Sequence, residues 1–259
     1  MNKKSVEQPP GAVLVVGGGI GGVQTALDLA EQGFKVYLVE RKIGIGGVMA
    51  QLDKTFPTND CSICILSPKL VEAGRHRNIE LITNAELQNL RGNAGNFQAD
   101  IIVHPRYVDL DKCTACGDCA KECPVTRPDL FNENLGDRQA IYRLFEQATP
   151  SAFAIEKAGI PPCRAACPIH VNAQGYIALI RDGKFKEALA LIREKNPFPG
   201  ITGRICTHPC EDKCERAKLD EPVAIDSLKR FVADFESEPE WDLTCEPEKD
   251  KKVGIIGSG

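Results

Sequence analysis

Cysteine spacing constrains this chain more than any other feature of its sequence. The 259 residues include 12 cysteines, and four of them fall within DKCTACGDCAKECPV, residues 111–125. That segment has little apolar material to bury, so it cannot fold around a hydrophobic core of its own. Its structure must depend on cross-links between the thiols or on a metal centre that they bind.

The four thiols are Cys113, Cys116, Cys119 and Cys123, and a proline follows them. This C-x2-C-x2-C-x3-C-P run is the spacing of bacterial ferredoxins, whereas zinc sites usually pair two C-x2-C knuckles across a longer stretch. A loop with a cysteine at every third position can wrap three thiolates around one cube of iron and sulfur. We therefore predict a [4Fe-4S] cluster here. In two-cluster ferredoxins the fourth cysteine serves the other cluster, so Cys123 need not share a cube with the first three.

A second group of five cysteines lies further along the chain: Cys163, Cys167, Cys206, Cys210 and Cys214. The last three are four residues apart, which places them on one helical face or in a tight loop. Brought together by the intervening helices, the five thiols suffice for one [4Fe-4S] cluster with one thiol to spare. Buried structural cysteines are the alternative. We expect His170 and His208, in the same segments, to be surface or hydrogen-bonding side chains rather than ligands.

The pair Cys61 and Cys64, in the sequence DCSIC, has three interpretations. A C-x2-C pair supports thiol exchange, so the two residues could be a redox dithiol near a flavin. They are also candidate cluster ligands, although a pair alone cannot hold a metal. The third interpretation is that they are two ordinary thiols.

The rest of the composition narrows the setting. Met1 is followed by the polar NKKSVEQPP rather than by a signal peptide, and no stretch reaches the roughly 20 apolar residues of a membrane span. We therefore expect a cytoplasmic protein, in which clustered cysteines bind metals or act as redox groups. The net charge is −4 and the charges of both signs are interleaved, so nucleic acid is not an expected partner.

A glycine motif near the N-terminus predicts a nucleotide site. Residues 11–16 and 35–40 have the pattern of strands, with a helical pattern between them. Gly17, Gly19 and Gly22 fit G-x-G-x-x-G at the turn from strand to helix. The first permits the turn, the second lets the backbone approach a pyrophosphate, and the third lets helix pack on strand. Glu40 ends the second strand, where it would bind a ribose diol and repel a 2′-phosphate, which favours FAD or NAD over NADP.

Periodicity and turn residues predict the remaining elements. Strands are expected at 79–88 and 97–104, a connector with one helix near 139–147, and helices at 172–181, 184–195 and 224–235. A last strand at 253–256 leads into a glycine loop at 257–259, which is how a second phosphate loop begins. We therefore expect the chain to be the N-terminal piece of a longer protein.

Two stretches resemble known flavoproteins. ERKIGIGG is similar to the continuation of the motif in two-dinucleotide-binding flavoproteins, which implies FAD beside Glu40, Arg41, Gly46 and Gly47. Residues 11–157 resemble the A-subunit of heterodisulfide reductase, through VLVVGGGIGGVQTALDLAEQGFKVYLVE, TFPTNDCSICILSPKLVEAGRHRNIELIT and PRYVDLDKCTACGDCAKECPV. That resemblance implies FAD at the glycine loop, [4Fe-4S] clusters at the ferredoxin run, and anaerobic electron transfer within a complex of several subunits.

Residues 158–259 resemble the N-terminal iron-sulfur region of dihydropyrimidine dehydrogenase and of the glutamate synthase small subunit. The matching segments are CRAACP, NPFPGITGRICTHPCEDKCERA and EPVAIDSLKRFVAD. The glutamate synthase type carries two further cysteines just before the position of Cys163, where this chain has EKAGIPP. This departure puts the usual pair of clusters in doubt for the segment by itself.

The predicted fold class is an α/β Rossmann-like FAD-binding domain, partial in this chain, followed by a ferredoxin-like cluster segment and an all-α iron-sulfur domain. The predicted boundaries are 1–105 for the FAD-binding domain, 106–128 for the ferredoxin-type segment, 129–157 for a connector, 158–240 for the helical iron-sulfur domain, 241–251 for a linker, and 252–259 for the start of a second dinucleotide-binding domain.

These patterns predict an electron-transfer oxidoreductase subunit that binds FAD and two or more [4Fe-4S] clusters. Expected partners are heterodisulfide reductase- or hydrogenase-type redox subunits or a ferredoxin, and NAD(P)H through a further C-terminal part. No acid-base or nucleophilic constellation is evident, so no catalytic residue is assigned. The alternatives are an NAD(P)H-dependent oxidoreductase like the glutamate synthase small subunit, and a non-catalytic iron-sulfur carrier whose glycine loop is empty.

Overall fold

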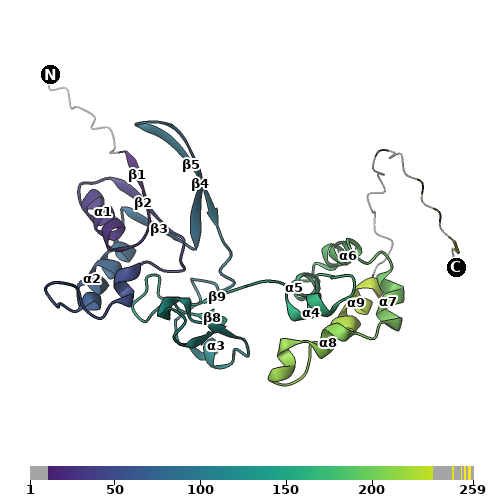
Figure 1. Ribbon diagram of the computed structural model, residues 1–259. Helices are drawn as coiled ribbons and strands as arrows, with labels where there is room; N and C mark the ends of the chain where they lie inside the picture. Colours follow the sequence, from purple (N-terminus) through teal and green to yellow (C-terminus); the bar gives the residue numbers. More distant parts are fainter. Residues whose placement is uncertain (1–10, 236–246, 248–251, 253, 255, 258–259) are drawn as a thin grey trace. The chain divides into compact units, whose positions relative to one another are not determined.

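The computed structural model describes residues 11–235 together with 247, 252, 254, 256 and 257 (Figure 1). The chain divides into two compact units, residues 1–158 and 159–259. Most of the predicted strand at 253–256 and of the glycine loop after it lies outside the described residues. In the part of the chain that is described, no helix is long and apolar enough to cross a bilayer.

The first unit is built on a three-stranded parallel sheet in the order β1-β2-β3, namely Ala12–Val16, Lys35–Glu40 and Ile79–Thr83. Helix α1 (Ile20–Glu31) connects β1 to β2, and helix α2 (Ser62–Arg75) lies between β2 and β3 in the chain (Figure 1). The predicted strand-helix-strand opening is confirmed to within a residue at each strand. Both helices were needed because parallel neighbours require crossover connections.

Apolar side chains from the sheet and both helices form one core. Its fully or nearly fully buried members are Val23, Ala26, Leu27, Ala30, Val36, Leu38, Ile45, Leu66, Leu70 and Ala73. Burial of each large aliphatic side chain stabilises the fold by about 1.5–3 kcal/mol. The core therefore fixes the position of the β1–α1 turn, where the glycine motif lies.

An antiparallel hairpin follows the sheet, formed by β4 (Ala85–Asn93) and β5 (Asn96–Val103). The single strand predicted at 79–88 is in fact two strands, because Asn84 between them has a φ of 56°. Asparagine tolerates this left-handed conformation better than most residues. Its side-chain Nδ2 donates a hydrogen bond of 2.9 Å to the carbonyl of His104, which fixes the change of direction.

Short elements complete the first unit: η1 (Val48–Gln51), α3 (Asp118–Lys121), β6 (Thr126–Pro128), η2 (Leu130–Asn132), β7 (Asp137–Gln139), β8 (Ile141–Tyr142) and β9 (Ala154–Ile155). The helix predicted near 139–147 is wrong. The apolar spacing of this stretch looks helical, but Ile141 pairs with Ile155 and Tyr142 with Ala154 in an antiparallel ladder. Backbone partners distant in sequence therefore override the local pattern.

The described residues of the second unit form helices and no strands: α4 (Pro162–Ala166), α5 (Ala173–Arg181), α6 (Phe185–Arg193), α7 (Pro199–Ile205), α8 (Pro209–Asp212), η3 (Glu215–Lys218) and α9 (Ile225–Asp234). The three helices predicted at 172–181, 184–195 and 224–235 are confirmed as α5, α6 and α9. Their core includes Tyr176, Ala188, Ile192 and Val232, each at most 1% exposed. The chain is thus mixed α/β, with its helical part in the second unit.

Candidate functional site

The glycine motif forms a tight turn between β1 and α1. Gly17 has a φ of 107°, a conformation that favours glycine. A Cβ on Gly22 would lie 1.9 Å from the carbonyl oxygen of Gly17, so a side chain there would separate helix from strand. Gly19 is the N-cap of α1, and a Cβ built on it meets nothing within 4 Å. The backbone at Gly19 is therefore open to a ligand, as the motif predicts.

Glu40, at the end of β2, holds this turn from beneath. Its carboxylate is buried, and Oε2 accepts a hydrogen bond of 2.6 Å from the backbone N–H of Gly18. Oε1 accepts a hydrogen bond of 2.8 Å from the N–H of Lys42. Each oxygen of a carboxylate has a second lone pair, so these contacts leave acceptor sites for a ribose diol.

Gly46 and Gly47 lie against the same turn. The N–H of Gly46 donates 2.8 Å to the carbonyl of Gly18, and a Cβ on Gly47 would lie 2.7 Å from the Cα of Gly19. Gly47 also has a φ of 61°, so both sterics and backbone conformation favour glycine there. The glycine pair thus sits beside the turn, where the flavoprotein resemblance expects it.

Arg41 is exposed and lines a cavity of about 390 Å³ together with Lys42, Tyr142 and Glu156. The N-terminus of α1 has neither a side-chain cap nor an acidic residue in its first turn. Helix N-termini without such a cap can bind phosphate through their first backbone N–H groups. Gly17, Gly19, Gly22, Glu40, Gly46 and Gly47 come together as a cradle that could hold a dinucleotide such as FAD. Arg41 lies beside it.

The ferredoxin-type cysteines occupy an irregular loop around α3. Ala115 and Gly117 have positive φ values of 58° and 86°, which turn the chain sharply between successive thiols. Cys116 and Cys119 are exposed, whereas Cys113 and Cys123 are half-buried. Burial and the neighbouring Cys116 raise the pKa of the Cys119 thiol.

Two weak contacts tie the half-buried members of this loop to the protein. The Sγ of Cys113 accepts a contact of 3.5 Å from the N–H of Phe153. The thiol of Cys123 lies 3.7 Å from the carbonyl oxygen of Val125. Cys113, Cys116 and Cys119 thus lie on one loop around α3, and Cys123 lies at its end.

Four of the five cysteines in the second unit line one cavity of about 410 Å³: Cys163, Cys167, Cys206 and Cys210. They come from the end regions of α4, α7 and α8 rather than from one helix face. Burial raises the pKa of Cys210 to about 11, and the charges of Glu211, Cys167 and Cys206 act in the same direction. Burial also raises the pKa of Cys163, and the charge of Cys214 raises it further. The cavity therefore gathers four thiols from three helices.

Cys214 does not line the cavity that the other four share. It lines a different cavity, of about 340 Å³, which Cys163 also borders. Three short elements separate these cysteines: Cys206 follows α7, Cys210 lies in α8 and Cys214 precedes η3. They therefore do not share one helical face. Which of the five thiols would hold a cluster stays a prediction, because Cys163 borders both cavities.

The four thiols around the cavity of the second unit are candidate ligands for a cluster. A [4Fe-4S] cube accepts thiolates at its corners, whereas a single zinc ion draws its ligands to about 2.0–2.3 Å from one point. Among residues 11–235 and the other described positions, no three His, Cys, Asp or Glu side chains form a group that could hold one metal ion.

Lys229 is a cavity residue that sequence reasoning missed. Its side chain lines the four-thiol cavity and its residue is only 8% exposed. Its Nζ lies 2.6 Å from Oδ1 of Asp226, without the angle of a hydrogen bond, and donates 3.5 Å to the carbonyl of Thr202. The available signal was its place on the apolar side of α9, between Ile225 and Val232. A buried cation here faces the negative charge that cluster thiolates would carry.

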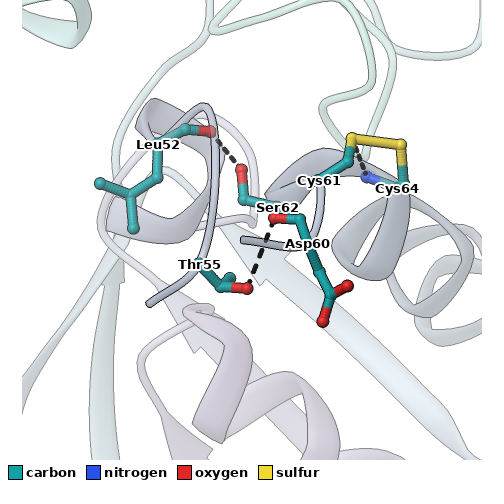
Figure 2. The surroundings of a disulfide bond; sticks show 6 residues. All are labelled: Leu52, Thr55, Asp60, Cys61, Ser62 and Cys64. Carbon is teal, nitrogen blue, oxygen red and sulfur yellow. Dashed lines mark hydrogen bonds between the residues drawn. A yellow bond between two sulfur atoms is a disulfide. The ribbon is translucent and has the colours of Figure 1, made fainter. Parts of the chain in front are cut away.

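The two histidines have structural contacts. The Nδ1 of His170 lies 3.1 Å from the carbonyl of Arg164, and His208 pairs with Glu211 at 3.3 Å. Cys61 and Cys64 are joined by a disulfide at the start of α2 (Figure 2). While the disulfide is closed, neither sulfur is available as a cluster ligand.

Three family models match parts of the chain. An FAD dependent oxidoreductase model matches residues 12–81, a 4Fe-4S binding domain matches residues 106–125, and the dihydropyrimidine dehydrogenase domain II model, a 4Fe-4S cluster domain, matches residues 141–241. These matches coincide with the glycine turn and with the two cysteine groups. They support FAD and multiple [4Fe-4S] clusters as cofactors.

The names of the curated relatives are consistent with these family models. The second iron-sulfur A-subunit of the CoB--CoM heterodisulfide reductase of Methanopyrus kandleri is 58% identical over 55% of this chain and 22% of its own length. The A-subunit of the H(2):CoB-CoM heterodisulfide,ferredoxin reductase of Methanothermobacter thermautotrophicus is 54% identical over 56% of this chain and 22% of its length. The chain thus spans about a fifth of these relatives. None of these names supports NAD(P)H as a partner.

Among solved structures, the match to L-proline dehydrogenase from P. horikoshii is 22% identical in sequence and covers 38% of this chain and 20% of the dehydrogenase chain. Its TM-score of 0.31 is too low to indicate a shared fold. The homology and the family models agree with the geometry of the two units. Over about 55% of its length this chain is similar to the A-subunits of heterodisulfide reductases, and its residues 141–241 match the dihydropyrimidine dehydrogenase domain II model, a 4Fe-4S cluster domain.

Proposed function

We propose that this chain is the flavin and iron-sulfur part of an electron-transfer oxidoreductase related to the A-subunit of heterodisulfide reductase. The observation that carries the proposal is the glycine turn, which is held by Glu40 and Gly47 and yet open above Gly19. The sheet order β1-β2-β3 and the crossover helix support a Rossmann-like FAD-binding domain. Redox subunits or a ferredoxin are the partners that the relatives' names suggest.

FAD, when bound, would exchange electron pairs for single electrons, and [4Fe-4S] clusters would carry the single electrons. The chain's own residues set the conditions for this chemistry. Gly19 and the N-terminus of α1 would receive the pyrophosphate, while Glu40 would bind the ribose. Cys113, Cys116 and Cys119 would hold one cluster.

In the second unit Cys163, Cys167, Cys206 and Cys210 would hold a further cluster. The thiols must lose their protons to bind metal, which burial opposes. The buried Lys229, which pairs with Asp226, would offset part of that cost, and the lining of the cavity is mostly apolar. These residues would therefore stabilise the bound cluster and tune its potential.

The test is a matched pair of glycine variants in anaerobically purified protein. Gly19 has an ordinary φ of −73° and open space around its Cβ, so Gly19→Val should fold normally while filling the space that a pyrophosphate needs. We expect flavin content to fall at least about tenfold, with the broad iron-sulfur absorption unchanged. Gly21→Ala, also in open space but two residues further along the chain, should keep its flavin.

Two results would contradict the proposal. Wild-type protein that carries iron and sulfide but no flavin, even after incubation with FAD, would support the non-catalytic carrier instead. Retention of flavin by Gly19→Val would show that the nucleotide binds elsewhere. Metal content by mass spectrometry separates iron from zinc in the same samples.

A further inference from the structure

The disulfide at the start of α2 has no role in the electron path proposed above. Cys61 is the N-cap of α2, and its Sγ accepts a hydrogen bond of 3.3 Å from the backbone N–H of Cys64 (Figure 2). The Cα atoms of the two residues are 5.3 Å apart, within the usual range for a bridged pair. The pair is therefore closed by the local helix geometry, with no contribution from a distant segment.

The two sulfur atoms differ in their surroundings. Cys64 is exposed, on the first turn of α2, whereas Cys61 is half-buried. Cys61 receives both the N–H of Cys64 and the positive end of the α2 dipole, and both stabilise a thiolate. Cys61 is thus the better leaving group, and Cys64 is the sulfur that an external reagent can reach.

The loop before α2 is built so that this end of the helix stays in place. The side chain of Ser62, which is fully buried, donates to the carbonyl of Leu52, and the N–H of Ser62 donates 3.1 Å to the carbonyl of Asp53. Thr55 closes the loop by donating 2.9 Å from its N–H to the carbonyl of Asp60, and its hydroxyl donates 3.4 Å to the same oxygen (Figure 2). The disulfide can therefore open and close without loss of the helix start.

We propose that Cys61 and Cys64 form a redox-active dithiol that exchanges two electrons with an external dithiol. A thiolate of the external dithiol attacks Sγ of Cys64, forming a mixed disulfide and releasing Cys61 as a thiolate. The second external thiolate then attacks its own sulfur partner in that mixed disulfide and releases Cys64. The external dithiol leaves as a disulfide, and its two protons end on the two cysteines.

Exposed apolar side chains on the preceding loop and the first turn of α2 suggest how such a dithiol reaches the site. Phe56 is 95% exposed and Leu52 is 49% exposed, and Ile65, next to Cys64, is 39% exposed. This surface would suit a protein that carries the dithiol. A small dithiol needs only the exposed sulfur of Cys64. The rates at which a protein dithiol and a small dithiol reduce the disulfide therefore distinguish the two sources.

The experiment uses the anaerobically purified chain with its cofactors, and reads a single peptide. Trypsin cleavage after Lys54 and Lys69 gives TFPTNDCSICILSPK, which contains both cysteines and no other. Native protein is exposed to dithiothreitol or to reduced thioredoxin, blocked with N-ethylmaleimide, then denatured, reduced and alkylated with iodoacetamide. We expect iodoacetamide labels on this peptide before treatment and maleimide labels after it, with thioredoxin at least about tenfold faster per dithiol.

Single variants test the order of the sulfur atoms. With glutathione disulfide, reduced Cys61→Ser should accumulate a glutathione adduct on this peptide, because Cys64 attacks and no resolving thiol remains. Cys64→Ser should accumulate at least about tenfold less, since Cys61 is shielded. Each variant is the control for the other. Both keep the backbone N–H of residue 64, which donates to the side chain of residue 61 at the N-cap of the helix.

Three outcomes would overturn the proposal. The peptide would carry maleimide from the start if the pair is always reduced, or would never accept maleimide if the bridge is purely structural. A fall in iron content in Cys61→Ser or Cys64→Ser, without loss of helical circular dichroism, would make the pair cluster ligands. None of these readouts depends on flavin, so failure here is separate from failure of the proposed function.

Discussion

The two cysteine groups are brought together in different ways. The group in the first unit spans eleven residues, 113–123, and its thiols are gathered by the loop itself, with two of the four exposed. The group in the second unit spans residues 163–214, and its thiols are half-buried around a cavity above a helical core. The first group is therefore organised by spacing, and the second by tertiary packing.

This difference decides what each site needs in order to persist. A loop with few apolar contacts has little stability of its own, so a bound cluster would supply much of its order. A cavity on a packed core exists before metal arrives. The following substitutions are designed to separate the two cases.

The largest effect is expected from the core beneath the second group. Ile192 is fully buried, and Ile192→Ala should lower the free energy of unfolding of the helical unit by about 2–5 kcal/mol, through lost burial and the cavity left behind. Chemical denaturation followed by circular dichroism measures it. Ile201→Ala, at a position 57% exposed, is the matched control. Cluster signals of the first group should survive Ile192→Ala, and their loss would mean that the two groups are not independent.

A smaller effect is expected at the cavity wall. Lys229→Met keeps the length of the side chain but leaves Asp226 without its cation, at a cost of about 2 kcal/mol, below the value for fully buried pairs because both side chains are 10–14% exposed. The cluster potential in this unit should also fall, because a positive charge is removed. Redox titration by EPR measures it, with the exposed Lys184→Met as control. An unchanged potential would place the cluster away from Lys229.

Iron removal should act on the loop of the first group. Lys112 and Lys121 flank or interrupt its cysteines, and their side chains are 85% and 72% exposed. After chelation we expect tryptic cleavage at both lysines to rise about tenfold, equivalent to about 1.4 kcal/mol of local opening. Cleavage at Arg181, which ends the packed helix α5, should change much less. Equal rises at all three sites would remove the distinction between the groups.

The smallest effect tests the packing itself. Tyr176 is 1% exposed, and its hydroxyl donates 2.9 Å to the carbonyl of Ile225. Burial also raises the pKa of this hydroxyl. Tyr176→Phe should cost about 1 kcal/mol, the value of one buried hydrogen bond, and leave the iron content unchanged. Loss of iron in this variant would show that the hydroxyl, which also lines the cavity, contacts the cluster.

Sequence patterns predicted well whatever depends on local spacing. The strand at 35–40, the glycine turn and the helices α5, α6 and α9 all follow from periodicity and turn residues. The C-x2-C-x2-C-x3-C-P run needed no tertiary information. The position of Glu40 beneath the turn followed from its place at the end of a strand.

Patterns failed where distant partners decide. Helix α2 was missed because Pro68 and two cysteines interrupt its apolar spacing, although its buried face, with Leu66 and Leu70, packs in the sheet core. The stretch 139–147 was taken for a helix because the ladder to β9 is invisible locally. Which thiols share a cavity, and that Lys229 joins them, depends on how α4, α7, α8 and α9 pack together.

The hydrogen bonds of Glu40 have a consequence for the rate of cofactor capture. Since the carboxylate already binds the N–H groups of Gly18 and Lys42, the loop is held in its receptive shape in the absence of nucleotide. The conformational entropy of ordering it is lost when the chain folds, and not when the nucleotide binds. Capture of the cofactor should then proceed as a single diffusional encounter, without a slower rearrangement after it.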